Sequence, residues 1–345
     1  MYSKTSLETK RSHILIAIDA MGGDFAPVNV VAGTIDALRE TSNRFEVVLV
    51  GSGDKLIREM QKYKGEELRY HIQEASQVID MHDPATAGIK QKRDSSISVG
   101  ITMHKEGNAD AFVSAGHSGA VLSTATLILG RLEGIGRPTI GTFLPTERGV
   151  CLLLDAGANV DCKPQHLYEF ALMGSIYSSE MFQIKNPSIG LLNIGEEESK
   201  GNDVVKEAHK LLRQSKLHFI GNVEGRDILP GKSDVVVCDG FIGNVILKFG
   251  ESIPSFFKGR IKRIASKSLF MKVFSGLVRN TLREALKSMD YEEYGGVPVL
   301  GVNGVVIIGH GKSTPKAIKN MLLRAEEMVR KNINGRIQET LTIEK

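Results

Sequence analysis

The chain has 345 residues, of which 44 are Lys or Arg and 40 are Asp or Glu, so its formal net charge is +4. Apolar residues make up 41% and charged residues 24%, as in ordinary globular proteins, which excludes disordered, collagen-like and coiled-coil chains. No apolar run approaches the roughly 18 residues of a membrane-spanning helix. So small a charge over this length does not indicate nucleic-acid binding. The three cysteines have neither disulfide nor zinc spacing, which indicates a reducing cytoplasm.

Short β-branched runs alternate with longer segments of helical period along the chain. The predicted strands are residues 13–18, 46–50, 111–114, 149–154, 188–194, 218–221, 235–238 and 305–308. The predicted helices are residues 28–40, 118–131, 165–180, 202–214 and 314–331. Strands that alternate with helices of this length pair in parallel. The sequence therefore predicts an α/β fold with three α/β/α layers and a mostly parallel, Rossmann-like sheet.

The predicted domain organisation is one α/β/α domain over residues 13–333. A polar N-terminal tail (1–12), without the apolar core of a signal peptide, and a C-terminal tail (334–345) flank it. Residues 253–288 interrupt the pattern, because they contain no strand and their apolar residues recur at helical spacing. We expect two helices that project as a hairpin, with Pro254 at a first helical position and a break near residues 266–269.

The hairpin segment is strongly basic. Residues 255–288 contain nine Lys or Arg and one acidic residue, Glu284. A basic amphipathic helix is typical of a membrane surface or an anionic partner. A dimerisation hairpin with a solvated basic face is the other interpretation, and the two are compatible.

Glycines collect where the predicted strands end. The chain has 36 glycines, about a tenth of its residues, against a usual share of about 7%. Six glycine-containing loops follow strands, at residues 19–24, 114–119, 155–159, 193–201, 239–244 and 309–313. The carboxyl ends of parallel strands form a ligand crevice, so we expect the six loops to meet at one edge as one active site. Tight strand–helix turns also require glycine, which is the alternative explanation.

Several familiar motifs are excluded. Gly311-Lys312-Ser313 resembles the end of a P-loop, but Val306 occupies the position of its first glycine. Neither a G-x-G-x-x-G fingerprint after the first strand nor a G-x-S-x-G elbow occurs. Carboxylates at loop starts usually cap helices, so no metal site is predicted at Asp19, Asp24 or Asp83.

Three loops carry residues suited to anion chemistry. Ser114 to Gly119 follow a strand and open a helix, whose free N–H groups and dipole attract anions. Lys200 lies in a glycine-flanked acidic loop, where it either meets a bound phosphate as a point charge or is solvated beside the acids at 196–198. Asn244 follows Gly243 at a strand–helix junction, where its amide either caps a helix or donates to a developing oxyanion.

Seven segments together resemble the acyl-ACP:phosphate acyltransferases of bacterial phospholipid synthesis, the PlsX family. They are residues 19–24, 114–120, 154–159, 190–201, 221–227, 234–248 and 294–311, and the match runs from about residue 13 to 331. Specific strings are Leu191-Leu-Asn-Ile-Gly-Glu-Glu-Glu198 and Val236-Val-Cys-Asp-Gly-Phe-Ile-Gly-Asn244. The resemblance implies a fold similar to those of phosphotransacetylases and isocitrate-type dehydrogenases.

The resemblance implies transfer of a long-chain acyl group from acyl carrier protein (ACP) to inorganic phosphate. The products are acyl phosphate, for phosphatidic acid synthesis, and free ACP, and no cofactor is implied. Lys200 is expected to meet the phosphate or developing negative charge, Asn244 the oxyanion or substrate carbonyl, and His310 to protonate the leaving thiol. The residues expected to bind phosphate or substrate are Asp19, Gly22, Gly23, Ser114, Gly116, His117, Ser118, Gly119, Gly243 and Gly311. His117-Ser118 departs from the family's more usual Asn-Thr.

The resemblance also implies partners. The family is dimeric, and its hairpin tip contacts the membrane, here through Leu269, Phe270 and Val273. We expect a cytoplasmic protein on the inner face of the membrane, which passes its product to a membrane glycerol-phosphate acyltransferase. Docking of acidic ACP on the basic hairpin is a hypothesis from charge. The alternatives are a short-chain phosphate acyltransferase acting on acyl-CoA, a related dehydrogenase, and a non-catalytic membrane-surface scaffold.

Overall fold

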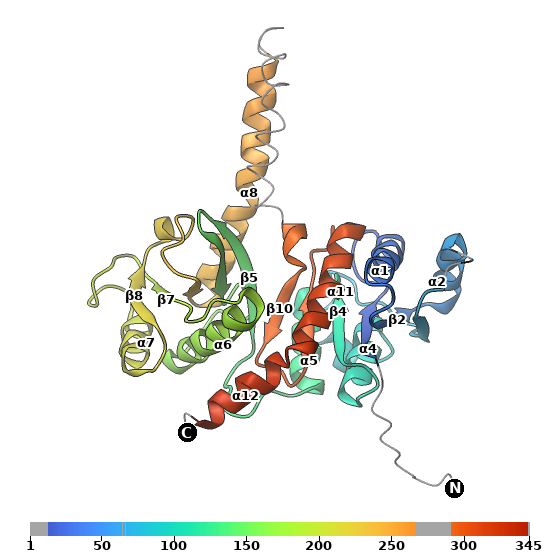
Figure 1. The fold of residues 1–345 in the computed structure, drawn as a ribbon, viewed down its shortest axis with the longest axis horizontal. Helices are drawn as coiled ribbons and strands as arrows, with labels where there is room; N and C mark the ends of the chain where they lie inside the picture. Colours follow the sequence, from blue (N-terminus) through green and yellow to red (C-terminus); the bar gives the residue numbers. More distant parts are fainter. Residues whose placement is uncertain (1–12, 64, 66, 267–290, 344–345) are drawn as a thin grey trace.

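The computed structural model describes residues 13–63, 65, 67–266 and 291–343, and within these a single sheet of eleven strands crosses the molecule (Figure 1). Its strand order is β3-β2-β1-β4-β11-β10-β5-β6-β9-β7-β8. The strands are β1 (Leu15–Asp19), β2 (Glu46–Gly51), β3 (Tyr70–Glu74), β4 (Ala111–Ser114), β5 (Thr139–Thr146), β6 (Gly149–Leu154), β7 (Ile189–Leu192), β8 (Phe219–Val223), β9 (Val235–Val237), β10 (Val297–Leu300) and β11 (Val305–Ile308).

Helices cover both faces of the sheet. They are α1 (Val28–Glu40), α2 (Gly53–Met60), α3 (Ala87–Lys90), α4 (Ser96–Lys105), α5 (Ser118–Ile128), α6 (Pro164–Phe182), α7 (Asp203–Gln214), α8 (Gly240–Ala265), α11 (Pro315–Arg330) and α12 (Ile333–Ile343), with short 3₁₀ turns η1 (Gln61–Tyr63), η2 (Gly225–Asp227) and η3 (Tyr291–Tyr294). Successive strand residues face opposite sides. Ile16 and Ile18 of β1 therefore join a core with α1, α6 and α11, whereas Ala17 joins a second core with α4 and α5. This alternation confirms the predicted three layers.

The strands do not all run in one direction. β4 and β11 are parallel, but β10 is antiparallel to both β11 and β5, and β5 is antiparallel to β6. β6, β9, β7 and β8 are then parallel to one another. Consequently β1, β4 and β11 run opposite to β6, β9 and β7. The sheet is mostly parallel, as predicted, but the expectation that all six glycine loops leave one edge is wrong.

All eight predicted strands are present, and β4, β6 and β11 have the predicted bounds. The prediction missed β3, β5 and β10, and also α2, α3 and α4. The predicted C-terminal tail is wrong, because residues 333–343 form α12. Its Ile333, Ile337 and Leu341 are buried in the main core, so an apolar helical face holds this segment on the domain.

Helix α8 projects from the body of the molecule (Figure 1). It begins at Gly240, because Asp239 caps it by accepting a hydrogen bond from Ile242 N at 2.9 Å. Pro254 consequently lies inside the helix, and the prediction of a first helical position is wrong. The helix ends at Ala265, beside the predicted break. The rest of the predicted hairpin, with Leu269, Phe270 and Val273, and the tail 1–12 lie outside the described residues.

Candidate active site

The glycine loops fall into two groups, one on each half of the sheet. The Asp19 group consists of the loops after β1, β4 and β11. The second group consists of the loops after β6 and β9, which carry Asp155 and Asn244, and the Lys200 loop (residues 193–201) after β7. The ends of β6, β9 and β7 are neighbours, since Val237 pairs with both Leu154 and Leu191. Lys200 and Asn244 therefore follow two neighbouring strands, β7 and β9, on the half of the sheet that does not carry the Asp19 group.

A buried carboxylate organises the Asp19 group. Ser114 Oγ donates to Asp19 Oδ2 at 2.7 Å, and Met21 N donates to Oδ1 at 3.1 Å. Gly116 N in turn donates to Ser114 Oγ at 3.0 Å. Burial raises the pKa of Asp19, while the hydrogen bonds from Ser96 and Ser114 act in the opposite direction. The carboxylate thus ties the loops after β1 and β4 together.

The glycines of this group allow close backbone contact. A Cβ at Gly22 would lie 2.2 Å from Asp19 Oδ2 and 2.8 Å from Gly116 N. Asp24 N donates to the carbonyl oxygen of Gly311 at 2.7 Å, and Gly23 has a φ of +102°. The structure therefore brings together the loops that carry Asp19, Gly22, Gly23, Ser114, Gly116 and Gly311.

His117 has a definite structural role. It is the N-cap of α5, and its Nδ1 accepts a hydrogen bond from Ala120 N at 3.2 Å. Ser118 is exposed beside it, and a Cβ at Gly119 would lie 3.1 Å from His117 Cε1. The imidazole thus supplies the cap that an asparagine at this position would supply. His310 is exposed, and its Nδ1 accepts from Lys312 N at 3.1 Å.

Asp155 anchors the loop after β6. Its two carboxylate oxygens accept five hydrogen bonds, from the backbone N–H groups of Ile140, Gly157, Ala158 and Asn159 and from Asn159 Nδ2. Burial raises the pKa of this carboxyl against the effect of those bonds. Because the carboxylate fixes its own loop, it also fixes Gly157, which lies beside Asn244.

Asn244 lies one turn inside α8 and is exposed. A Cβ at Gly157, which has a φ of +133°, would lie 3.4 Å from Asn244 Cβ and 3.6 Å from its Oδ1. The helix-cap interpretation of Asn244 is wrong, since Asp239 is the N-cap. Its amide remains available to a ligand near the helix start.

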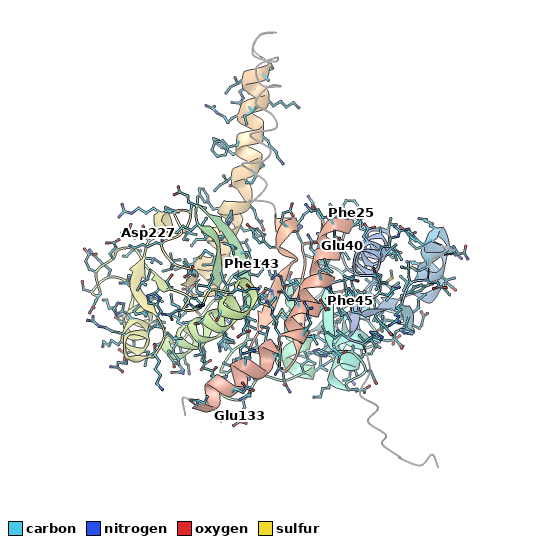
Figure 2. The ribbon with its side chains drawn as sticks, viewed as in Figure 1. Phe25, Glu40, Phe45, Glu133, Phe143 and Asp227 are labelled. Carbon is cyan, nitrogen blue, oxygen red and sulfur yellow. The ribbon has the colours of Figure 1, made fainter. Side chains whose placement is uncertain are left out.

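The Lys200 loop is acidic, and two of its three acids, Glu196 and Glu198, are paired with other cations. Glu196 lies 2.5 Å from Lys232 Nζ, and Glu198 pairs with Arg213. Lys232 also contacts Asp227, labelled in Figure 2, and Glu196 is the largest cause of the raised pKa of Lys232. Among the described residues, Lys200 Nζ has no carboxylate partner within 4.0 Å, and the side chain is exposed. Lys200 is thus an exposed, solvated cation that no described carboxylate neutralises, and both of its predicted interpretations stay open.

Sequence reasoning missed three supporting residues, Asp155, Asn193 and Asn222. Asp155 and Asn159 bracket Gly157 directly after a buried strand, a spacing that indicates a carboxylate binding its own loop. Asn193 and Asn222 contact the Lys200 loop from the ends of two neighbouring strands. No local sequence pattern predicts a hydrogen bond from an asparagine amide to the backbone of a loop elsewhere in the fold.

Three other features bear on the site: the buried cysteines, the clusters of metal-ligating side chains and the length of the apolar helices. Burial raises the pKa of Cys151 to about 12 and also raises that of Cys238, so both thiols are unreactive. In the described part of the chain, no three His, Cys, Asp or Glu side chains are placed to hold a metal ion. No helix there has the length and apolar character needed to cross a membrane.

The sequence matches known proteins over nearly its whole length. A family model described as "Fatty acid synthesis protein" matches residues 14–336. A phosphate acyltransferase from Heliobacterium modesticaldum is 49% identical over 327 residues, covering 94% of this chain and 96% of that protein. One from Chlorobaculum parvum is 45% identical over 338 residues, covering 95% and 99%. The chain belongs to the PlsX family of phosphate acyltransferases. It is therefore an acyltransferase, which sets aside the non-catalytic scaffold.

Solved structures share the fold. A phosphotransacetylase from Streptococcus pyogenes superposes with a TM-score of 0.61 at 16% identity, covering 92% of this chain and 94% of that one. The EutD phosphotransacetylase from Staphylococcus aureus gives a TM-score of 0.58 at 15% identity, with the same coverage. The predicted likeness of the PlsX-family fold to that of phosphotransacetylases is confirmed.

Proposed function

We propose that this PlsX-family chain transfers a long-chain acyl group from acyl carrier protein to inorganic phosphate. The products are acyl phosphate, which enters phosphatidic acid synthesis, and carrier protein with a free thiol. The observation that supports this reaction best is the placement of Lys200. Its ammonium is without a carboxylate partner in the described structure, although its loop is acidic. The loop follows β7, which is the neighbour of the strand that precedes Asn244, β9.

The proposed reaction needs no protein nucleophile. A phosphate oxygen attacks the thioester carbonyl carbon, the C–S bond breaks, and the thiolate takes a proton. His310 is the donor proposed from the family resemblance, although it follows β11, on the half of the sheet that does not carry Lys200. Lys200 binds the phosphate as a point charge. The Asn244 amide donates to the oxyanion of the tetrahedral intermediate. Holding the two substrates together supplies the rest of the acceleration.

We assign substrate binding to the Asp19 group. Gly22, Gly23, Gly116 and Gly311 bring the backbones of three loops close together, which suits contact with a phosphate or with the carrier-linked substrate. Ser118 adds an exposed hydroxyl at the start of α5. Asp19 itself is buried, so its proposed part is to hold Ser114 and the loop that follows it.

We further propose a homodimer at the inner face of the membrane, in the cytoplasm. α8 presents exposed apolar side chains, Phe241, Val245, Phe249 and Phe256, and carries basic residues toward its far end. Both features suit a dimeric enzyme attached to the membrane surface, which passes acyl phosphate to a membrane glycerol-phosphate acyltransferase.

The donor is tested by incubating the full chain with palmitoyl-ACP, palmitoyl-CoA or acetyl-CoA, each with and without inorganic phosphate. Acyl phosphate and free thiol are both measured. The proposal predicts phosphate-dependent acyl phosphate, formed fastest from palmitoyl-ACP. Faster turnover of acetyl-CoA would instead support the short-chain acyl-CoA enzyme.

A further inference from the structure

Two asparagine side chains contact the backbone of the Lys200 loop. Asn193 directly follows β7, and its Nδ2 donates to the carbonyl oxygen of Lys200 at 3.1 Å. Asn222 lies in β8, and its Nδ2 donates to the carbonyl oxygen of Glu197 at 2.9 Å. The two strands are parallel neighbours, with Leu192 opposite Val223. Strand β8 thus supplies the Asn222 amide, and the first residue of the loop, directly after β7, supplies the other.

These bonds converge on one residue. The carbonyl oxygen of Glu197, held by Asn222, also accepts a hydrogen bond from Lys200 N at 3.1 Å. The N–H and the C=O of Lys200 are therefore both fixed, the first through Asn222 and Glu197 and the second by Asn193. Gly201 completes the arrangement, since its φ is +90° and a Cβ there would lie 2.7 Å from Asn193 Oδ1.

Stability by itself does not favour a buried asparagine at position 222. The residue is 4% exposed, and its Oδ1 accepts no hydrogen bond from the described residues. A leucine of similar shape would bury no polar atom there. What asparagine adds at this position is the bond to Glu197.

We propose that Asn222 and Asn193 are positioning residues that aim the Lys200 ammonium at the substrate phosphate. This inference rests on the function proposed above for Lys200. The surface ion pairs of Glu196 and Glu198 are exposed, so they fix the loop weakly. The buried amide of Asn222 carries most of the positioning.

The kinetic test compares four full-length chains: native, Lys200→Ala, Asn222→Leu and the double variant. Each is assayed for acyl phosphate formation at varied phosphate concentration. We expect Asn222→Leu to lower kcat/KM for phosphate at least tenfold in the native background and less than twofold in the Lys200→Ala background. An equal loss in both backgrounds, or none in the native background, overturns the positioning role. Native activity in Lys200→Ala would overturn the proposed role of Lys200 as well.

Hydrogen exchange gives a readout that does not depend on residual activity. In Asn222→Leu the amides of residues 194–201 should exchange at least tenfold faster, with exchange in β7 and β8 unchanged. Unchanged exchange in the loop overturns the proposal. Val223→Ala is the matched control, because this neighbouring buried side chain packs against Gly190 of β7 and has no polar atom that could hydrogen-bond the Lys200 loop. It should lower Tm while kcat/KM stays within twofold of native.

Discussion

The backbones of Gly243 and Asp155 lie so close that a Cβ at residue 243 would be 1.9 Å from the carbonyl oxygen of Asp155. The loop after β6 therefore packs directly on the first turn of α8. Asn244, the next residue, takes its position from this contact. Neither side can yield through a flexible side chain, because the contacting oxygen belongs to the backbone.

Gly243→Ala should consequently destabilise the chain by about 3 kcal/mol and lower the rate of acyl transfer more than tenfold. The overlap forces α8 away from the Asp155 loop and displaces Asn244. Urea unfolding measures the first effect, and the acyl phosphate assay the second.

Gly259→Ala is the control on the same helix. A Cβ at Gly259 would meet no atom within 4 Å, and the position is helical. Alanine should stabilise the helix by roughly 0.5–1 kcal/mol without affecting the rate. If both variants behaved alike, the contact between Gly243 and Asp155 would have no special role.

Residues buried on both faces of the sheet made most of the strands predictable. β4, β6 and β11 are short apolar runs, and their predicted bounds are correct. β3 was missed because it is a polar edge strand, and β10 because Pro298 lies inside it. β5 contains Gly141 and Pro145, which weakened its strand pattern.

The reversal of strand direction was the larger omission. It begins at the hairpin between β5 and β6, whose turn is Glu147-Arg148 followed by Gly149 at a φ of +132°. A short polar turn between two β-branched runs is a hairpin signal that the sequence did contain. The roles of Lys200 and Asn244 rested on the family resemblance, because isolated lysines and asparagines carry no local signature of catalysis.

Helix α12 should contribute measurably to stability. Ile337 is 1% exposed in the main core, so Ile337→Ala should cost about 2–5 kcal/mol. Ile343, at the end of the same helix, is 77% exposed, and Ile343→Ala should be nearly neutral. Equal unfolding free energies for the two variants would show that α12 does not stay docked in solution.

Asp19 predicts a pH-dependent difference in stability. Burial raises the pKa of the Asp19 carboxyl above the ordinary 3.8. The stability that the protonated carboxyl contributes to the folded state is therefore full below pH 3.8 and is lost as pH rises through the folded-state pKa. Asparagine does not titrate. The stability deficit of Asp19→Asn relative to native should therefore be largest near about pH 4 and smaller near about pH 7. Urea unfolding at a series of pH values measures it, and a deficit that grows with pH would mean that the pKa is lowered instead.

The role of Lys200 as the cation that meets phosphate is tested most directly by Lys200→Ala, with Lys210→Ala as the matched control. Lys210 is an exposed lysine on α7 that pairs with Glu207. Acyl phosphate formation from palmitoyl-ACP and inorganic phosphate should fall by about 10²–10³ in Lys200→Ala and stay within about twofold of native in Lys210→Ala. A native rate of acyl phosphate formation in Lys200→Ala would contradict the account.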